Sequence, residues 1–282
     1  MRYVAFGNET DPAGGGVFIG VLDPTGTAVA PLAPVADFYA DPASFLRAVP
    51  DVAVIPLEQV RMVPPVPATA RVLCLGLNYR AHVAESSAEV APHPTVFGRF
   101  SSTLCCDGDL VAVPPAEGRL DWEAELVVVI GARARRVTPQ DALRYVAGYC
   151  VGQDFSDRDL QMSGTPPQFS MGKSHENFSP IGPWLTTPDD CGDPDDLRIT
   201  CDVNEVRYQD SSTEDMVTNV AGLIAYLSSV VEIRPGDVIF TGSPAGVGQG
   251  HTPPTFLAPG DVVTSTITGL GSLRNVTTRT TH

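Results

Sequence analysis

The chain has 282 residues, of which 18 are basic and 33 acidic, and its formal net charge is −15. So acidic a surface excludes nucleic acids and anionic membranes as partners, because both are bound through basic surfaces. The apolar fraction of 43% is enough to bury a core, whereas 26 glycines and 26 prolines exclude a helical bundle and favour a protein rich in strands and loops.

The first 60 residues alternate short apolar runs with Gly, Pro and Asp, which predicts a small β-rich region. They contain no apolar stretch of about 7 to 15 residues as in a signal peptide, and no run of about 18 apolar residues follows. We therefore expect a soluble, cytoplasmic protein. The proline-rich segment 63–67 predicts a boundary between an N-terminal region (residues 1–70) and a catalytic domain (residues 71–282).

Beyond residue 70, the hydrophobic patterns predict strands and helices more clearly. An apolar run over 71–77 predicts a buried strand, and Asn78 is expected to cap a short helix from Tyr79 to about Glu85. The other predicted elements are strands over 126–130, 146–152, 237–241 and 262–267, a helix over 139–146 capped by Thr138, and the most clearly amphipathic helix between 213 and 231. The six cysteines lack C-x-x-C spacing, so buried free thiols are expected, with a zinc site or disulfides as the alternative.

Several catalytic motifs are missing, among them the nucleophile elbow, the zinc-protease helix and both nucleotide-binding loops. The glycine-rich segment 242–250 is instead expected to be a tight loop whose backbone approaches a ligand or another strand.

The first positive signal is a pair of carboxylates, Glu123 and Glu125, before an apolar strand. Alternate strand residues share a face, and two neighbouring carboxylates repel each other unless a cation lies between them. A solvated strand end is the alternative. Asp154 ends the next strand and would complete an all-oxygen site, which selects Mg²⁺, Mn²⁺ or Ca²⁺ rather than zinc.

Five motifs, in order, resemble the fumarylacetoacetate hydrolase family over roughly residues 71–276. They are GLNYRAHVAE (76–85), LDWEAELVVVIG (120–131), GQDFSDRDLQ (152–161), MGKSHENFSPIGPW (171–184) and RPGDVIFTGSPAGVG (234–248). The resemblance implies an α+β, mostly β fold with a mixed β-sandwich or β-roll catalytic domain, usually in a homodimer. It also implies Mg²⁺ or Mn²⁺ at Glu123, Glu125 and Asp154, a catalytic dyad of His82 and Glu85, and roles for Gln161 and Lys173 toward the substrate.

The residues themselves agree with two of these implications. His82 and Glu85 are three apart, so on a helix they share a face, where the carboxylate can orient the imidazole as a base. A surface ion pair is the alternative, and the helix could act as a lid. Lys173 is the single lysine of the chain. This predicts a site that needs a compact ammonium rather than a guanidinium.

Departures from the family pattern concern the substrate pocket. Arg99 replaces a frequent lysine and Ser243 a frequent threonine, and together with Tyr79 and Gln161 they are the candidate substrate-binding residues. The other departures are Gln153 for asparagine, His175 for an aromatic residue, and Glu205 for the glycine after Asn204.

These features predict a metal-dependent hydrolase that cleaves a C–C bond in a 2,4-dioxo acid of the acylpyruvate or fumarylpyruvate type, through a metal-bound enolate. The alternatives are a decarboxylase or isomerase of oxo acids (oxaloacetate or 2-hydroxyhepta-2,4-diene-1,7-dioate) or a specialised biosynthetic enzyme with the same site. A non-enzymatic scaffold is the alternative from another class.

Overall fold

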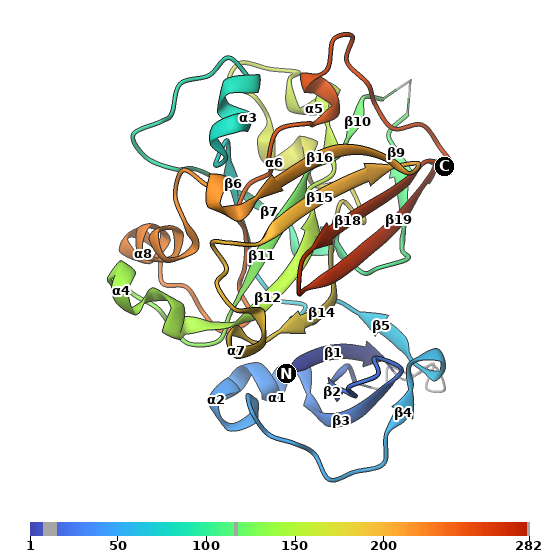
Figure 1. Ribbon diagram of the computed structural model, residues 1–282, viewed down its shortest axis with the longest axis vertical. Helices are drawn as coiled ribbons and strands as arrows, with labels where there is room; N and C mark the ends of the chain where they lie inside the picture. Colours follow the sequence, from blue (N-terminus) through green and yellow to red (C-terminus); the bar gives the residue numbers. More distant parts are fainter. Residues whose placement is uncertain (8–15, 116–117, 281–282) are drawn as a thin grey trace.

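The computed structural model describes residues 1–7, 16–115 and 118–280 (Figure 1). The described chain is mostly β with short helices, and its sheets contain both parallel and antiparallel pairs, which confirms the predicted fold class. The longest helix, α8, has 11 residues. Among the helices of the described ranges, none is long and apolar enough to cross a membrane.

A 12-stranded sheet runs through the molecule. Its strands, in spatial order, are β4 (Ile55–Pro56), β3 (Ala28–Pro34), β2 (Phe18–Leu22), β1 (Arg2–Gly7), β14 (Ser179–Thr186), β12 (Val146–Gln153), β11 (Ala124–Ile130), β17 (Val238–Phe240), β6 (Val72–Gly76) and β7 (Thr95–Arg99). Two short strands lie off this path: β5 (Arg61–Val63) pairs with β1, and β8 (Leu104–Cys105) pairs with β14.

A five-stranded sheet packs across β11 and β12 (Figure 1). Its strands, in order, are β16 (Val206–Ser212), β15 (Arg198–Val203), β18 (Val262–Ile267), β19 (Gly271–Arg279) and β9 (Leu110–Val113). The short strands β10 (Leu120–Asp121) and β13 (Ser156–Asp157) form a separate pair. The helices are α1 (Val35–Ala40), α2 (Pro42–Phe45), α3 (Arg80–Glu85), α4 (Pro139–Ala142), α5 (Arg158–Gln161), α6 (Phe169–Gly172), α7 (Pro188–Cys191) and α8 (Val220–Val230).

Strand β11 is buried on both faces, which explains its continuous apolar sequence. Leu126 and Val128 face the five-stranded sheet and α8, and pack with residues such as Ile199. Val127 and Val129 point the other way and pack with the N-terminal region.

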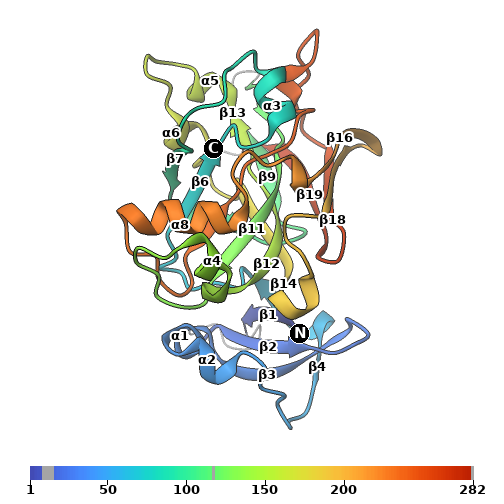
Figure 2. The same cartoon turned by 60° about the vertical axis from the view of Figure 1, so that its left-hand side comes forward.

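The N-terminal strands lie at one end of the molecule, with β1 beside β14 (Figure 2). Tyr3 pairs with Leu185, and the aromatic residues of this region, Tyr3 and Phe38 among them, share a core cluster with Val127 and Val129 of β11. The division of the chain into two domains at segment 63–67 stays a prediction.

The predicted strands β6, β11, β12, β17 and β18 are confirmed to within two residues at either end. The predicted cap at Asn78 is wrong. Tyr79 holds the N-cap position of α3, and the Asn78 side chain donates hydrogen bonds to the carbonyls of Thr218 (3.0 Å) and Thr241 (2.8 Å). Contacts distant in sequence have overridden a local capping preference.

Two predicted helices are shorter than expected. Helix α4 ends at Ala142 and continues as one 3₁₀ turn, and the Thr138 hydroxyl donates to the Asp141 carboxylate instead of capping the backbone. Helix α8 begins only after Asn219, whose side chain accepts the Gly222 N–H. All six cysteines are buried and free, as expected.

Candidate active site

Three carboxylates from neighbouring strands form a buried cluster. Glu123 directly precedes β11, Glu125 lies within it, and Asp154 directly follows β12, the antiparallel partner of β11. The Asp154 N–H donates to the Glu123 carbonyl oxygen at 2.8 Å, which fixes the two strand ends together. One oxygen from each carboxylate lies within 4.8 Å of the others. The structure therefore brings together the three residues that the sequence singled out as metal ligands.

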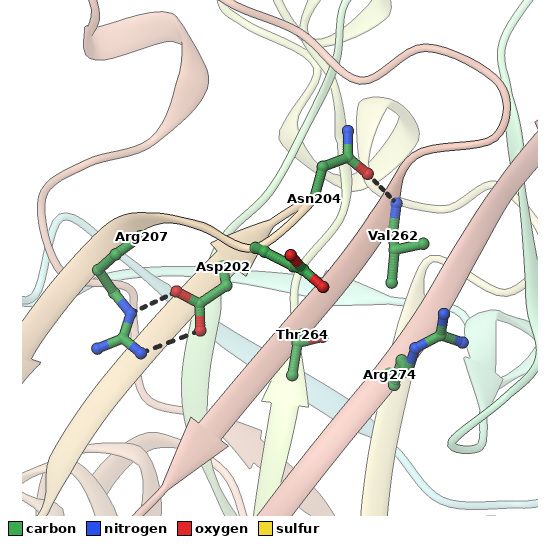
Figure 3. A pocket seen from close by; sticks show the side chains of 7 residues that line it. Asp202, Asn204, Arg207, Val262, Thr264 and Arg274 are labelled. Carbon is green, nitrogen blue, oxygen red and sulfur yellow. Dashed lines mark hydrogen bonds and ion pairs between the residues drawn. The ribbon is translucent and has the colours of Figure 1, made fainter.

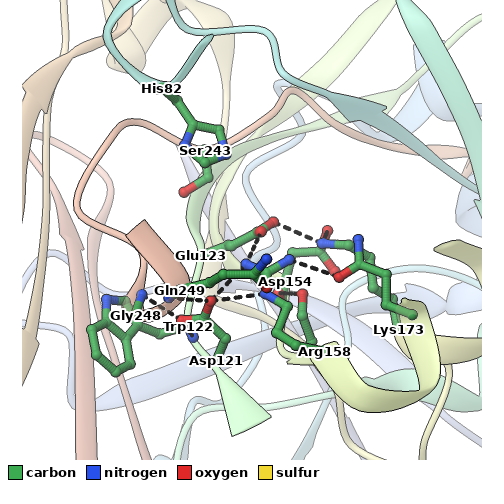
Figure 4. A network of polar contacts seen from close by, with 12 residues as sticks. His82, Asp121, Trp122, Glu123, Asp154, Arg158, Lys173, Ser243, Gly248 and Gln249 are labelled. Atoms are coloured by element: carbon green, nitrogen blue, oxygen red, sulfur yellow. Dashed lines mark hydrogen bonds and ion pairs between the residues drawn. The ribbon is translucent and has the colours of Figure 1, made fainter. Parts of the chain in front are cut away.

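Cationic side chains surround two of these carboxylates (Figure 4). Lys173 Nζ donates to Glu123 Oε2 and Asp154 Oδ2, both at 2.7 Å, and Arg158 Nη2 donates to Glu123 Oε1 at 2.5 Å. The Arg99 guanidinium donates to Asp154 Oδ1. Glu125 accepts the Gly242 N–H at 2.7 Å, and no salt bridge to it is found within the described ranges.

The surroundings of Glu123 and Glu125 shift their pKa values in opposite directions. Burial opposes the charged form of Glu123, but Lys173 and Arg158 outweigh it and hold the pKa of this carboxyl well below its usual range. Burial raises the pKa of Glu125 well above its usual range, and the charges of Asp154 and Glu123 add to the effect. Glu125 thus lies beside two other carboxylates with no salt bridge among the described residues, and the buried, all-oxygen donor set suits a divalent cation such as Mg²⁺ or Mn²⁺.

Lys173 owes its position to a close contact between two short helices. It follows α6, which packs on α5 at Gly172. A Cβ atom at Gly172 would lie 2.6 Å from the N, Cα and Cβ atoms of Gln161, so only glycine allows this approach. Two of the three ammonium donors of Lys173 are used by the carboxylates, which leaves one for another acceptor.

His82 and Glu85 form a hydrogen-bonded pair on α3. His82 Nδ1 and Glu85 Oε2 are 2.9 Å apart, and the Gly246 N–H donates to Glu85 Oε1 at 2.9 Å. Burial raises the pKa of Glu85, but the bonds to His82 and Gly246 outweigh burial and leave it below its usual value. A Cβ atom at Gly250 would clash with the Glu85 carboxyl group, so the glycine-rich loop fits closely around this side chain.

This loop has the close approach expected from its sequence. At Gly246 the backbone has φ +99°, and a Cβ atom there would clash with the Tyr208 carbonyl of strand β16. The loop thus packs against another strand while its backbone binds Glu85.

One cavity of about 640 Å³ joins the two groups of residues: Glu123, Lys173, His82 and Glu85 all line it. Of the four predicted substrate-binding residues, Gln161 and Ser243 also line the cavity. Tyr79 and Arg99 are not among the residues that line it: Tyr79 is fully buried, and Arg99 is bonded to Asp154 of the acidic cluster.

Sequence reasoning missed two charged residues of the site, Asp121 and Arg158. Asp121 is fully buried and accepts hydrogen bonds from the backbone N–H groups of Gly248 (2.6 Å) and Gln249 (3.0 Å) and from Arg158 Nε (2.8 Å). It thereby holds Arg158 against Glu123 and ties the glycine-rich loop to the acidic cluster. Both residues lie inside the motifs quoted above, but their pairing depends on packing between distant segments.

The other departures from the family pattern lie in different surroundings. Gln153 is buried behind the cluster, where its side-chain oxygen accepts the Glu123 N–H at 2.5 Å. His175 Nε2 lies 3.1 Å from Asp157 Oδ2. Asn204 and Glu205 form the turn between β15 and β16, both with positive φ.

That turn borders a second hollow, on the outer face of the five-stranded sheet (Figure 3). Its volume is about 630 Å³, and Arg207 forms an ion pair with Asp202 in its wall. The hollow is lined by two acidic and two basic residues, Asp202, Glu205, Arg207 and Arg274, and among the described residues it holds no cluster of three potential metal ligands.

The protein-family model described as fumarylacetoacetate (FAA) hydrolase C-terminal matches residues 71–278. The mitochondrial oxaloacetate tautomerase Fahd2a of Rattus norvegicus is 41% identical over 221 residues, which are 78% of this chain and 70% of the rat protein.

Two solved structures are similar over the full length of both chains. The 2-hydroxyhepta-2,4-diene-1,7-dioate isomerase of Mycobacterium marinum is 28% identical with a TM-score of 0.79. The maleylpyruvate hydrolase of Sphingobium sp. SYK-6, in complex with manganese(II) ion and pyruvate, is 26% identical with a TM-score of 0.78.

Proposed function

Since the chain belongs to the fumarylacetoacetate hydrolase family, as its motifs predicted, we propose that it hydrolyses a C–C bond in a 2,4-dioxo acid of the acylpyruvate type with the help of a divalent metal ion. One observation carries the proposal. A hydrogen-bonded histidine–glutamate pair and an acidic cluster suited to Mg²⁺ or Mn²⁺ meet in one cavity, with the single lysine of the chain between its carboxylates.

The metal would be held by Glu123, Glu125 and Asp154, and it would supply Lewis-acid polarisation of the 2-oxo group. His82 is the base. When its Nδ1 hydrogen is donated to Glu85, Nε2 carries the lone pair that takes a proton from water.

The resulting hydroxide oxygen forms a bond to C4, the acyl carbonyl carbon, and the C3–C4 bond then breaks. Its electron pair moves into the C2–C3 fragment as an enolate, and His82 returns the proton to C3. The products are a carboxylic acid and pyruvate, so the atoms of substrate and water are all accounted for. The remaining ammonium donor of Lys173 stabilises the developing negative charge, and Gln161 binds the substrate beside it.

The manganese-bound maleylpyruvate hydrolase supports this reaction, because pyruvate is a product of the proposed cleavage. A second candidate is interconversion of enol and oxo forms, or decarboxylation, of a short oxo acid, which uses the same enolate. The oxaloacetate tautomerase and the dienedioate isomerase among the relatives favour it.

The test compares acylpyruvates, oxaloacetate and a hydroxydienedioate as substrates with Mg²⁺ or Mn²⁺, while pyruvate and CO₂ are measured. We expect release of pyruvate without CO₂ from an acylpyruvate. His82→Ala should lose this activity and still bind the metal in calorimetry, whereas Glu125→Ala should lose both. Normal turnover by His82→Ala would refute its role as base.

The homodimer, which rests on the family resemblance, and the cytoplasmic location both stay predictions. Light scattering of the purified protein measures its molar mass in solution and so tests the dimer. A non-enzymatic scaffold is supported only if neither Mg²⁺ nor Mn²⁺ binds and no oxo acid reacts.

A further inference from the structure

The cavity has two chemically different ends. At its buried end, Glu123 and Lys173 are 7% and 3% exposed. At its open end, Leu77 and Met162 are 41% and 51% exposed. The exposed lining also includes the neutral polar residues Ser86, Thr95 and Gln249. A ligand whose charged head binds at the acidic cluster therefore extends toward a largely apolar mouth.

The apolar surface begins immediately beside the lysine. Lys173 Nζ lies 5.6 Å from the centre of the Phe97 ring, and the centres of the Phe97 and Phe169 rings are also 5.6 Å apart. Both rings line the cavity, and Val247 lines it from the glycine-rich loop. Hydrocarbon atoms beyond the charged head would thus lose contact with water against these side chains.

The positive charges of the cavity are confined to its buried end. Among its described lining residues, the lysine and arginine side chains are those of Lys173 and Arg158, and both are paired with Glu123. Nearer the mouth the charged side chain is the carboxylate of Glu85. A second carboxylate on the ligand would lose its hydration without gaining a cation, and it would be repelled by Glu85.

The backbone conformation of Leu77 also indicates that the apolar mouth is a binding site. Leu77 has φ +54°, in the left-handed region that glycine adopts most easily, and yet a large apolar side chain stands there at the surface. Strained residues of this kind persist where the surrounding structure holds them, often at binding sites.

We propose that the mouth binds an uncharged, apolar acyl group, so that the ligand is a 2-oxo acid with one carboxylate at the buried end and a hydrocarbon tail. The inference rests on the proposed function for the identity of the charged head. Acylpyruvates with an uncharged acyl group fit this cavity. Fumarylpyruvate, oxaloacetate and dienedioates carry a second carboxylate and do not fit it.

Binding tests the inference without requiring turnover. With Mg²⁺ present, calorimetry compares 2-oxohexanoate with 2-oxoadipate, two six-carbon 2-oxo acids that differ only in a terminal methyl or carboxylate. We expect 2-oxohexanoate to bind at least tenfold more tightly. Equal affinities, or tighter binding of 2-oxoadipate, would overturn the inference.

Two methionines supply a matched pair of variants. Met162 and Met171 are both 51% exposed, but only Met162 is among the described residues that line the cavity. Met162→Lys should shift the ratio of affinities at least tenfold toward 2-oxoadipate, and Met171→Lys should leave it unchanged. An equal shift in both variants would show that the tail does not reach the mouth.

Turnover separates this inference from the proposed function. Crotonylpyruvate should be hydrolysed at least tenfold more efficiently than fumarylpyruvate, in which a carboxylate replaces the terminal methyl group. If neither is hydrolysed while 2-oxohexanoate still binds more tightly than 2-oxoadipate, the proposed function is refuted and the inference of an apolar acyl site is supported. If fumarylpyruvate is the better substrate, the proposed function is supported and the inference of an apolar acyl site is refuted.

Discussion

Gly172→Ala tests whether the contact between α5 and α6 sets the position of Lys173. The new Cβ atom would lie 2.6 Å from three atoms of Gln161, where ordinary contacts are 3.4–4 Å. The two helices must therefore separate by about 1 Å, a shift that lengthens the 2.7 Å bonds of Lys173 beyond hydrogen-bonding distance. Misplacement of a catalytic group by about 1 Å costs up to about 10²-fold in rate, and overpacking costs about 1–3 kcal/mol of stability.

The assay measures kcat and KM for acylpyruvate hydrolysis, with thermal unfolding as the measure of stability. Gly164→Ala is the control, because its Cβ atom would make only ordinary contacts, the nearest at 3.5 Å. A double-mutant cycle with Lys173→Met separates positioning from general damage. If Gly172 acts through Lys173, Gly172→Ala should cost little further activity in the Lys173→Met protein. An equal loss in both backgrounds, or a fully active Gly172→Ala protein, would refute the reasoning.

Three further predictions concern the metal, Arg158 and pH. Mg²⁺ at 100 times its dissociation constant should stabilise the protein by about 2.7 kcal/mol, seen as a chelator-reversible rise in Tm that Glu125→Ala abolishes; a similar rise in this variant would contradict the assignment. Arg158→Lys keeps the charge but loses the planar fork whose Nε and Nη2 atoms bond Asp121 and Glu123 separately, so unfolding measurements should show a loss of about 1.5–3 kcal/mol, and an unchanged Tm would argue against it. Because the folded pKa of Glu85 is lowered, its stabilising contribution is complete above the unfolded pKa and is lost as pH falls through the folded value. The stability gap between wild type and Glu85→Gln should then be full at neutral pH and shrink below about pH 4.3; a gap that grows on acidification would be inconsistent.

Short-range patterns predicted the parts of the site that depend on one or two elements. Strand alternation identified Glu123 and Glu125, and the end of the following strand identified Asp154, because β11 and β12 are adjacent in sequence and pair directly. Helical spacing placed His82 and Glu85 on one face for the same reason.

Features that depend on distant segments could not be predicted in this way. The hydrogen bond that Arg158 donates to Asp121 joins two segments that meet only when β10 pairs with β13. Asn78 resembles a helix cap in sequence, but its amide is used by carbonyl groups far along the chain. Buried polar side chains form hydrogen bonds with whichever partners the fold brings near, so the local preference for helix capping has little influence.

The pairing of β1 with β14 has a practical consequence for attempts to shorten the protein. A chain that began at residue 71 would keep the whole region that the family model matches. It would, however, leave the backbone of β14 near Leu185 unpaired and uncover the side of β11 that carries Val127 and Val129. Open strand edges beside exposed apolar residues promote self-association. Such a fragment should therefore aggregate even though every residue of the acidic cluster is still present.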